Sequence, residues 1–231
     1  MNIVAILTGK GGSNLKDKNI LKINGRPCLY YPCNAAKKVK IIQHYFASSE
    51  DPKILKYAEK YGYKIIKRPK YLSKINSQHI DVIKHALLQI NKLNIKPDII
   101  VVLLANAPIV HTQWINDAIN ILLKNKSATS VVPVINNNDH HPIRAKKIKN
   151  GYLKPHFKIN PKISTNRQDL KSNYFLCHNF WVIKTKYIYL DNGQPPWKFL
   201  GKKIMPYVID KSIDIHEKED LFIAQKIMGN K

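Results

Sequence analysis

The residues best suited to chemistry lie in one short loop near the amino terminus. Three of the four residues from position 9 to position 12 are glycines, and Lys10, Lys16 and Lys18 lie among them or just after them. Glycine has no Cβ and tolerates positive φ, so its backbone N–H groups can converge on a small anion. Lysine side chains add positive charge around it. The loop predicts a cradle for a triphosphate, with these candidate residues: Thr8, Gly9, Lys10, Gly11, Gly12, Ser13, Lys18 and Asn19.

The spacing of the loop excludes two familiar phosphate-binding motifs. It lacks the G-x-x-x-x-G-K-[ST] order of a P-loop, and it is not G-x-G-x-x-G. A glycine-rich turn can also serve only to reverse the chain. The elements around the loop therefore have to support the phosphate interpretation.

Those elements alternate between apolar runs and amphipathic stretches. The run from Ile3 to Leu7 leads into the loop and predicts a buried strand, and Ile99 to Leu104 predicts a central strand. The alternation favours an α/β fold with a doubly wound, mainly parallel sheet. Ligands of such sheets bind at the carboxyl ends of the strands, which puts Thr8 to Lys18 and Ala105 to Pro108 on one rim.

The remaining pattern predicts one domain over residues 1–231, without a repeat or a linker. We expect helices at about 27–38, 52–61, 79–91, from Thr112 or Asn116 to about 124, and about 217–228. We expect further strands at 41–47, 64–67, 128–134 and 174–184. The strand–helix rhythm stops at residue 140, and residues 140–185 are expected to be extended segments with turns.

The amino-acid composition limits the functional classes to which the protein can belong. The formal net charge is +24, but only four of the 39 basic residues are arginines, and lysines are spread along the whole chain. An AT-rich genome enriches lysine without selection for binding, and attraction of anionic substrates is the alternative explanation. Without a recognisable nucleic-acid-binding motif, we expect no specific nucleic acid partner.

The cysteines and the apolar segments indicate the compartment. Cys28, Cys33 and Cys177 have no disulfide-like or metal-like spacing, and His140, His141, His156 and His178 fit no standard zinc site. The first apolar run is too short for a signal peptide, and no run approaches a membrane span. These features predict free thiols, a cytoplasmic location and no membrane partner.

Five stretches carry motifs of one known family, in the family's order. The opening resembles the strand, glycine loop, Lys-Asn pair and Gly-x-Pro turn of the acylneuraminate cytidylyltransferase (CMP-sialic acid synthetase) family. Its matching residues are Leu7 to Ser13, Lys18-Asn19-Ile20 and Asn24-Gly25-Arg26-Pro27. The later matches are Val102 to Pro108, His141 to Pro155, Arg167 to Leu170 with Tyr174 and Asn179, and Ser212 to Leu221.

The resemblance implies a Rossmann-like nucleotidyltransferase fold and a CTP-dependent enzyme. It implies that an acidic nine-carbon sugar of the sialic, legionaminic or pseudaminic type attacks the α-phosphorus of CTP and that pyrophosphate leaves. It also implies Mg²⁺, with Mn²⁺ as the alternative, and a homodimer built partly from an extended insertion at residues 136–185.

The resemblance also implies roles for individual residues. Lys18 and Asp214 would be catalytic, and Asp214 with His216 would hold the metal. The substrate-binding candidates are Asn106, Arg167, Gln168 and Asn179. Asp214 as a helix cap and Arg167 in a surface ion pair are the structural alternatives.

Three departures from the family pattern leave alternatives open. Either Gly9 or Lys10 stands where the family has a loop arginine, and Leu104 replaces a glutamine. His216 replaces the second carboxylate of an Asp-x-Asp motif, so that water replaces that ligand, or the metal preference differs, or activity is lost. The rival hypotheses are transfer to another sugar or from another base, and a non-catalytic nucleotide-binding protein.

Overall fold

The computed structural model describes residues 1–12, 15–160 and 162–229. Its centre is strand β1 (Ile3–Thr8), which is buried along its whole length. β1 pairs in parallel with β4 (His44–Ser49) on one side and with β6 (Ile99–Leu104) on the other. β5 (Lys64–Lys67) extends the sheet in parallel beyond β4. Successive strands therefore extend the sheet to one side from β1 to β5 and to the other side from β6 onward. Ligands of α/β sheets bind at such a reversal of strand order, here between β1 and β6.

The second half of the sheet contains its antiparallel strands. β11 (Phe180–Lys184) lies between β6 and β7 (Ser130–Asn136) and is antiparallel to both. β12 (Ile204–Val208), which the sequence pattern did not predict, pairs in parallel with β7. Four of the pairings around β1, β4 and β7 are nevertheless parallel, and the predicted doubly wound, mainly parallel α/β sheet is confirmed.

The predicted single strand over residues 174–184 is wrong, because a bulge divides it into β10 (Tyr174–Leu176) and β11. Both strands pair with β7. From Leu176 to Val182 the chain advances six residues, whereas the partner on β7 moves only three, from Val134 to Val131. Such an insertion bends a strand and redirects its side chains. The residues of the bulge, Cys177 to Asn179, lie next to the candidate site.

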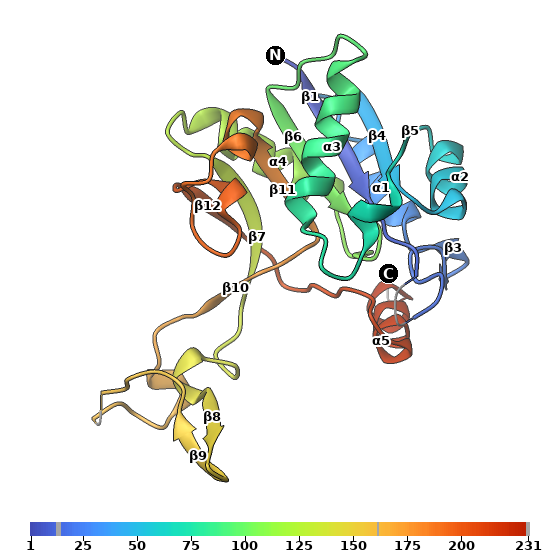
Figure 1. The fold of residues 1–231 in the computed structure, drawn as a ribbon. Helices are drawn as coiled ribbons and strands as arrows, with labels where there is room; N and C mark the ends of the chain where they lie inside the picture. Colours follow the sequence, from blue (N-terminus) through green and yellow to red (C-terminus); the bar gives the residue numbers. More distant parts are fainter. Residues whose placement is uncertain (13–14, 161, 230–231) are drawn as a thin grey trace.

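Helices cover both faces of the sheet, as Figure 1 shows. α1 (Tyr30–Lys37), α2 (Pro52–Lys60) and α4 (Thr112–Lys124) bury apolar side chains against one face. α3 (His79–Asn91) covers the other face together with the 3-10 turns η4 (Thr185–Tyr189) and η5 (Lys198–Leu200). The two apolar layers form the core of the protein.

A small hairpin corrects the predicted start of the first helix. Pro27 was expected in its first turn, but β2 (Lys22–Ile23) pairs with β3 (Arg26–Pro27), and α1 begins at Tyr30. Asn24 and Gly25 connect the strands with φ of 47° and 80°. An Asn-Gly pair suits a two-residue hairpin turn, because both positions need positive φ.

The carboxyl-terminal segment returns to the amino-terminal loop. α5 (Lys218–Gly229) packs against the β2–β3 hairpin, with Ile23, Cys28, Ile215 and Ala224 in a small apolar cluster. The backbone N–H of Ile215 also donates to the carbonyl oxygen of Asn106, just after β6. These contacts bring the Asp214–His216 segment to the rim of the sheet.

An arm formed by residues 137–160 and 162–173 projects from the sheet between β7 and β10 (Figure 1). It contains the hairpin of β8 (Lys146–Lys149) and β9 (Tyr152–Pro155) and the short 3-10 turns Pro142–Arg144 and Arg167–Asp169. Ile148, Tyr152 and Leu153 on the hairpin are more than two-thirds exposed. An extended insertion is thus present, but it is shorter than the predicted 136–185, because β10 and β11 belong to the central sheet. Its role in a dimer stays a prediction.

The three cysteines are free, as expected, and all three are buried. Among the described residues, no helix combines the length and the apolar character required to cross a bilayer. The cytoplasmic location stays a prediction.

Candidate active site

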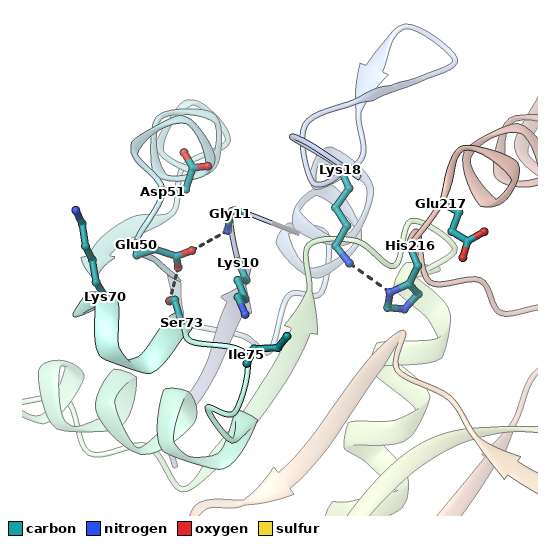
Figure 2. A pocket seen from close by; sticks show the side chains of 11 residues that line it. Lys10, Gly11, Lys18, Glu50, Asp51, Lys70, Ser73, Ile75, His216 and Glu217 are labelled. Atoms are coloured by element: carbon teal, nitrogen blue, oxygen red, sulfur yellow. Dashed lines mark hydrogen bonds between the residues drawn. The ribbon is translucent and has the colours of Figure 1, made fainter. Parts of the chain in front are cut away.

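Two neighbouring cavities open at the carboxyl ends of β1 and β6. The outer cavity, of about 690 Å³, is lined by the glycine loop, the start of α2, the 3-10 turn η1 (Lys70–Ser73) and the His216 segment (Figure 2). The inner cavity, of about 310 Å³, lies over Thr8 and Leu104. Lys10, Lys18 and Ile75 line both cavities. An anion bound where the cavities meet would therefore lie close to two lysines.

The glycine loop is ordered by an acidic side chain. The backbone N–H of Gly11 donates to Oε1 of Glu50 over 2.8 Å, and Ser73 Oγ donates to Oε2 over 2.6 Å (Figure 2). Arg68, almost completely buried, donates to the same Oε2 and to the carbonyl oxygen of Gly9. Burial acts to raise the pKa of the Glu50 carboxyl, but the hydrogen bonds from Arg68 and Ser73 outweigh it and hold the pKa below its ordinary value.

Glycine is required at two loop positions for different reasons. A Cβ at Gly11 would come within 2.6 Å of Oδ2 of Asp51, which caps α2, so a larger residue would push the loop off the helix. Gly12 has a φ of +61°, a conformation that other residues rarely adopt. The glycines thus allow close packing and a tight bend. At Gly11 the N–H that was predicted to hold phosphate is already bound to Glu50.

Thr8 is held beneath the loop by a histidine that the sequence analysis did not single out. Thr8 Oγ1 lies 3.0 Å from Nε2 of His79 and donates to the carbonyl oxygen of Leu103. Because Thr8 Oγ1 donates its proton to Leu103, the His79 ring donates to Thr8. Burial, with smaller effects of Arg68 and His178, lowers the pKa of His79 to about 4, so the ring is neutral at neutral pH.

Lys18 reaches the site from the loop after the glycines. Its Nζ lies 3.5 Å from Nδ1 of His216, and Figure 2 shows the two side chains pointing toward each other. Burial lowers the pKa of Lys18, and the nearby Asp214 partly counters this effect. His216, 198 positions further along the sequence, thus meets Lys18 at the wall of the outer cavity, and Asp214 lies close enough to act on Lys18 electrostatically.

Two asparagines of the predicted site hold backbone segments in place. Asn19, which is 2% exposed, donates from Nδ2 to the carbonyl oxygen of Lys10 over 2.8 Å. Asn106 donates to the carbonyl oxygen of Ile215 over 3.3 Å and also lines the inner cavity. Asn19 therefore shapes the glycine loop, and Asn106 fastens the Asp214 segment to the end of β6.

Asp214 and His216 have different partners, contrary to the expectation that both side chains reach one ion. Asp214 Oδ2 accepts from Nδ1 of His178 over 3.0 Å, whereas His216 faces Lys18. Asp214 does not cap α5 either, because Asp220 accepts the backbone N–H groups of His216 and Glu217. Within the described residues, no group of three or more His, Cys, Asp and Glu side chains could hold a metal ion.

Asn179, predicted to bind substrate, instead holds the fold together. Its side chain is completely buried, Nδ2 donates to the carbonyl oxygen of Ile109 over 2.7 Å, and Oδ1 accepts from Ser212 over 2.7 Å. It anchors the bulge between β10 and β11 to the segment that leads to Asp214. Its burial leaves it no surface to offer a substrate.

Arg167 and Gln168 lie on the arm and line neither cavity of their own chain. Arg167 pairs with the exposed carboxylate of Asp139 over 3.1 Å. This is the surface ion pair that the sequence analysis gave as the alternative to substrate binding. Within one chain, these two residues are therefore separate from the rest of the predicted site. Ser13, another predicted phosphate-binding residue, lies outside the described residues.

Sequence reasoning assigned no supporting role in the site to four residues on other elements, namely Glu50, Arg68, His79 and His178. Glu50 and Arg68 follow β4 and β5 directly, at the same rim as the glycine loop, and this position was an available signal. His79 begins α3, and His178 lies in the bulge. No local pattern marks the bulge.

Comparison with known proteins identifies the family of the chain. The family model described as "Cytidylyltransferase" matches residues 4–226. The N-acylneuraminate cytidylyltransferase A of Danio rerio is 26% identical over 220 residues, covering 93% of this chain and 49% of the relative. The post-translational flagellin modification protein B of Campylobacter coli is 25% identical over 236 residues, covering 99% of this chain and 96% of that protein. The chain thus spans about half of the first relative and nearly all of the second.

Among solved structures, the fold resembles that of a CMP:2-keto-3-deoxy-manno-octonic acid synthetase complexed with CTP. The TM-score is 0.72, and the match covers 99% of both chains. The sequence identity is only 13%, so this likeness concerns the fold.

Proposed function

Because this chain belongs to the cytidylyltransferase family, we propose that it transfers CMP from CTP to an acidic nine-carbon sugar of the sialic, legionaminic or pseudaminic type. The observation that carries the proposal is the meeting of Lys18, the glycine loop and the Asp214 segment at the rim of the sheet. An ammonium group at the cavity wall, with the carboxylate of Asp214 close to it, suits a reaction that needs charge neutralisation and positioning. The curated relative named for N-acylneuraminate supports the choice of sugar.

In the proposed reaction, a hydroxyl oxygen of the sugar acid attacks the α-phosphorus of CTP. A new oxygen–phosphorus bond forms, the bond from the α-phosphorus to the bridging oxygen breaks, and pyrophosphate leaves with that oxygen. The hydroxyl proton passes to solvent. Lys10 and Lys18 are positioned to offset charge on the phosphates, because both line the two cavities. Arg68, Ser77 and the apolar side chains of the inner cavity would hold the nucleoside.

Asp214 fits a divalent cation. Its Oδ1 atom is buried and has no hydrogen-bond partner among the described residues, and an unpaired carboxylate oxygen of this kind suits a hard cation. Mg²⁺ usually takes one or two carboxylates and completes its shell with water and substrate phosphates. The cation would neutralise charge that develops on the phosphates. Mg²⁺, with Mn²⁺ as the alternative, is therefore part of the proposal.

The sugar-binding roles of Arg167 and Gln168 require a second copy of the chain. Both residues are on the arm, and neither lines a cavity of its own chain. The arm also exposes apolar side chains on the β8–β9 hairpin, which a partner could cover. We therefore propose a homodimer in which the arm of one protomer approaches the site of the other.

A pyrophosphate-release screen tests the proposed function. Each of the four nucleoside triphosphates is combined with Mg²⁺ and a panel of sugar acids, with neutral sugars as the control. Release with CTP and an acidic nine-carbon sugar is the expected result. Release with another base or with a neutral sugar would favour the rival transferase. Nucleotide binding without any release of pyrophosphate would favour a non-catalytic homologue. This rival is tested because Leu104 and His216 replace residues of the family pattern.

A further inference from the structure

The carboxylate of Asp214 is held from one side by His178. Asp214 Oδ2 lies 3.0 Å from Nδ1 of His178. An ionised carboxylate can only accept hydrogen bonds, so the imidazole carries its proton on Nδ1 and donates it. The second oxygen, Oδ1, is buried without a hydrogen-bond partner among the described residues. One oxygen of Asp214 is thus fixed by the protein, and the other is left unpaired.

His178 is itself firmly positioned. Its ring packs edge-on against Trp181 and Trp197, at centroid distances of 5.5 and 5.8 Å. The next residue, Asn179, is completely buried and bonded to Ile109 and Ser212. The bulge between β10 and β11 places both residues there. These contacts restrict the orientation of the imidazole.

His216 occupies a different place. It is exposed, and its Nδ1 accepts from Lys18 (Figure 2), whereas Asp214 Oδ2 accepts from His178. It therefore lies beside the lysine that is proposed to hold phosphate.

We propose that His178 is the positioning residue of a divalent-cation site at Asp214, and that His216 is not a ligand of this site. The inference rests on the proposed function only in taking Asp214 as the cation ligand. Residues that hydrogen-bond to metal ligands fix the orientation of those ligands, and losing such a residue typically weakens metal binding by about 10- to 100-fold. His178 is arranged to act on Asp214 in this way. Oδ1 is then directed toward the cation.

The test uses Tb³⁺ as a probe, because this hard cation prefers oxygen ligands and emits when a nearby tryptophan is excited. Trp181 and Trp197 both contact the His178 ring, so a cation at Asp214 lies near them. Tb³⁺ is titrated into the full chain without nucleotide, and Mg²⁺ is added to displace it. The variants are H178F, which keeps an aromatic ring but removes the donor, H178N, whose amide can replace Nδ1, and H216A as the matched control.

We expect tryptophan-sensitised emission from the wild type that Mg²⁺ displaces, and about 10- to 100-fold weaker Tb³⁺ binding by H178F. H178N and H216A should stay within about threefold of the wild type, since neither loses the hydrogen bond to Asp214. Thermal melting checks that each variant is folded. The inference is overturned if the wild type shows no such emission, if H178F binds as well as the wild type, if H178N is as weak as H178F, or if H216A is equally impaired.

The pyrophosphate assay separates this inference from the proposed function. If the wild type shows the expected Tb³⁺ pattern but releases no pyrophosphate with any substrate, the cation site is supported and the proposed transferase function is contradicted. If the wild type is active and H178F binds Tb³⁺ as tightly as the wild type, the proposed function is supported and the proposed role of His178 is contradicted.

Discussion

The backbone N–H of Gly11 donates to the carboxylate of Glu50 across 2.8 Å, so an acidic side chain binds the loop that was predicted to hold phosphate. The same carboxylate accepts from Arg68, which also holds the carbonyl oxygen of Gly9. Glu50 and Arg68 together fix the loop from the ends of two neighbouring strands. The phosphates therefore have to meet the lysines rather than the N–H of Gly11.

Replacing Glu50 by glutamine should destabilise the protein. Arg68 and Glu50 are only 4% and 15% exposed, and E50Q leaves the buried guanidinium without its opposite charge. We expect the free energy of unfolding to fall by about 2 to 3 kcal/mol, the scale of hydrogen bonds to charged groups. Urea denaturation measures it. E59Q, at an exposed position of α2, is the control and should change little; equal losses in the two variants would contradict the role of the pair.

Lys18→Ala should weaken the binding of CTP. A lysine at the wall of both cavities would make a charge-assisted hydrogen bond to the triphosphate, worth about 1 to 3 kcal/mol, so the dissociation constant should rise about 5- to 150-fold. Thermal-shift titration with CTP measures this change. Lys16→Ala, at an exposed position of the same loop, should bind CTP like the wild type. If CTP stabilises the Lys18 variant as strongly as the wild type, Lys18 is not in the site.

Mixed dimers test the proposed role of the arm. Lys18→Ala and Arg167→Ala should each abolish or strongly reduce activity when alone. If Arg167 acts at the partner's site, a mixed dimer of the two variants has one site that contains both native residues. Random mixing should then restore about a quarter of wild-type activity. Mixing that restores nothing, with dimers confirmed by mass, would contradict the shared site.

His79 should make stability depend on pH. Its pKa is about 4 in the folded protein and 6.5 for the free group, so between these values the unfolded chain binds more protons. The free energy of unfolding should therefore fall as pH is lowered from 6.5 to 4, by at most about 1.4 kcal/mol per unit from this group. His79→Gln keeps a donor for Thr8 but does not titrate, so its pH profile should be flatter. His140→Gln, exposed on the arm, should keep the wild-type slope.

Local sequence determined most elements of the body of the protein. The helix over 79–91 and the strands over 64–67 and 99–104 have the predicted bounds, because their apolar spacing and flanking residues are sufficient signals. The family motifs identified the glycine loop, Lys18 and the Asp214 segment as belonging together. This was possible because the order of motifs along a chain can be seen in the sequence itself.

Only the tertiary structure decided how these parts meet. The bulge that places His178 against Asp214 arises from a three-residue offset between two strands paired with β7, and pairing register depends on distant residues. The contacts of Gly11 with Glu50 and of Thr8 with His79 join positions 39 and 71 residues apart. Sequence periodicity reports which face of an element is buried, but it carries no information on which polar side chain lies opposite it. Sheet order and helix packing supply that information.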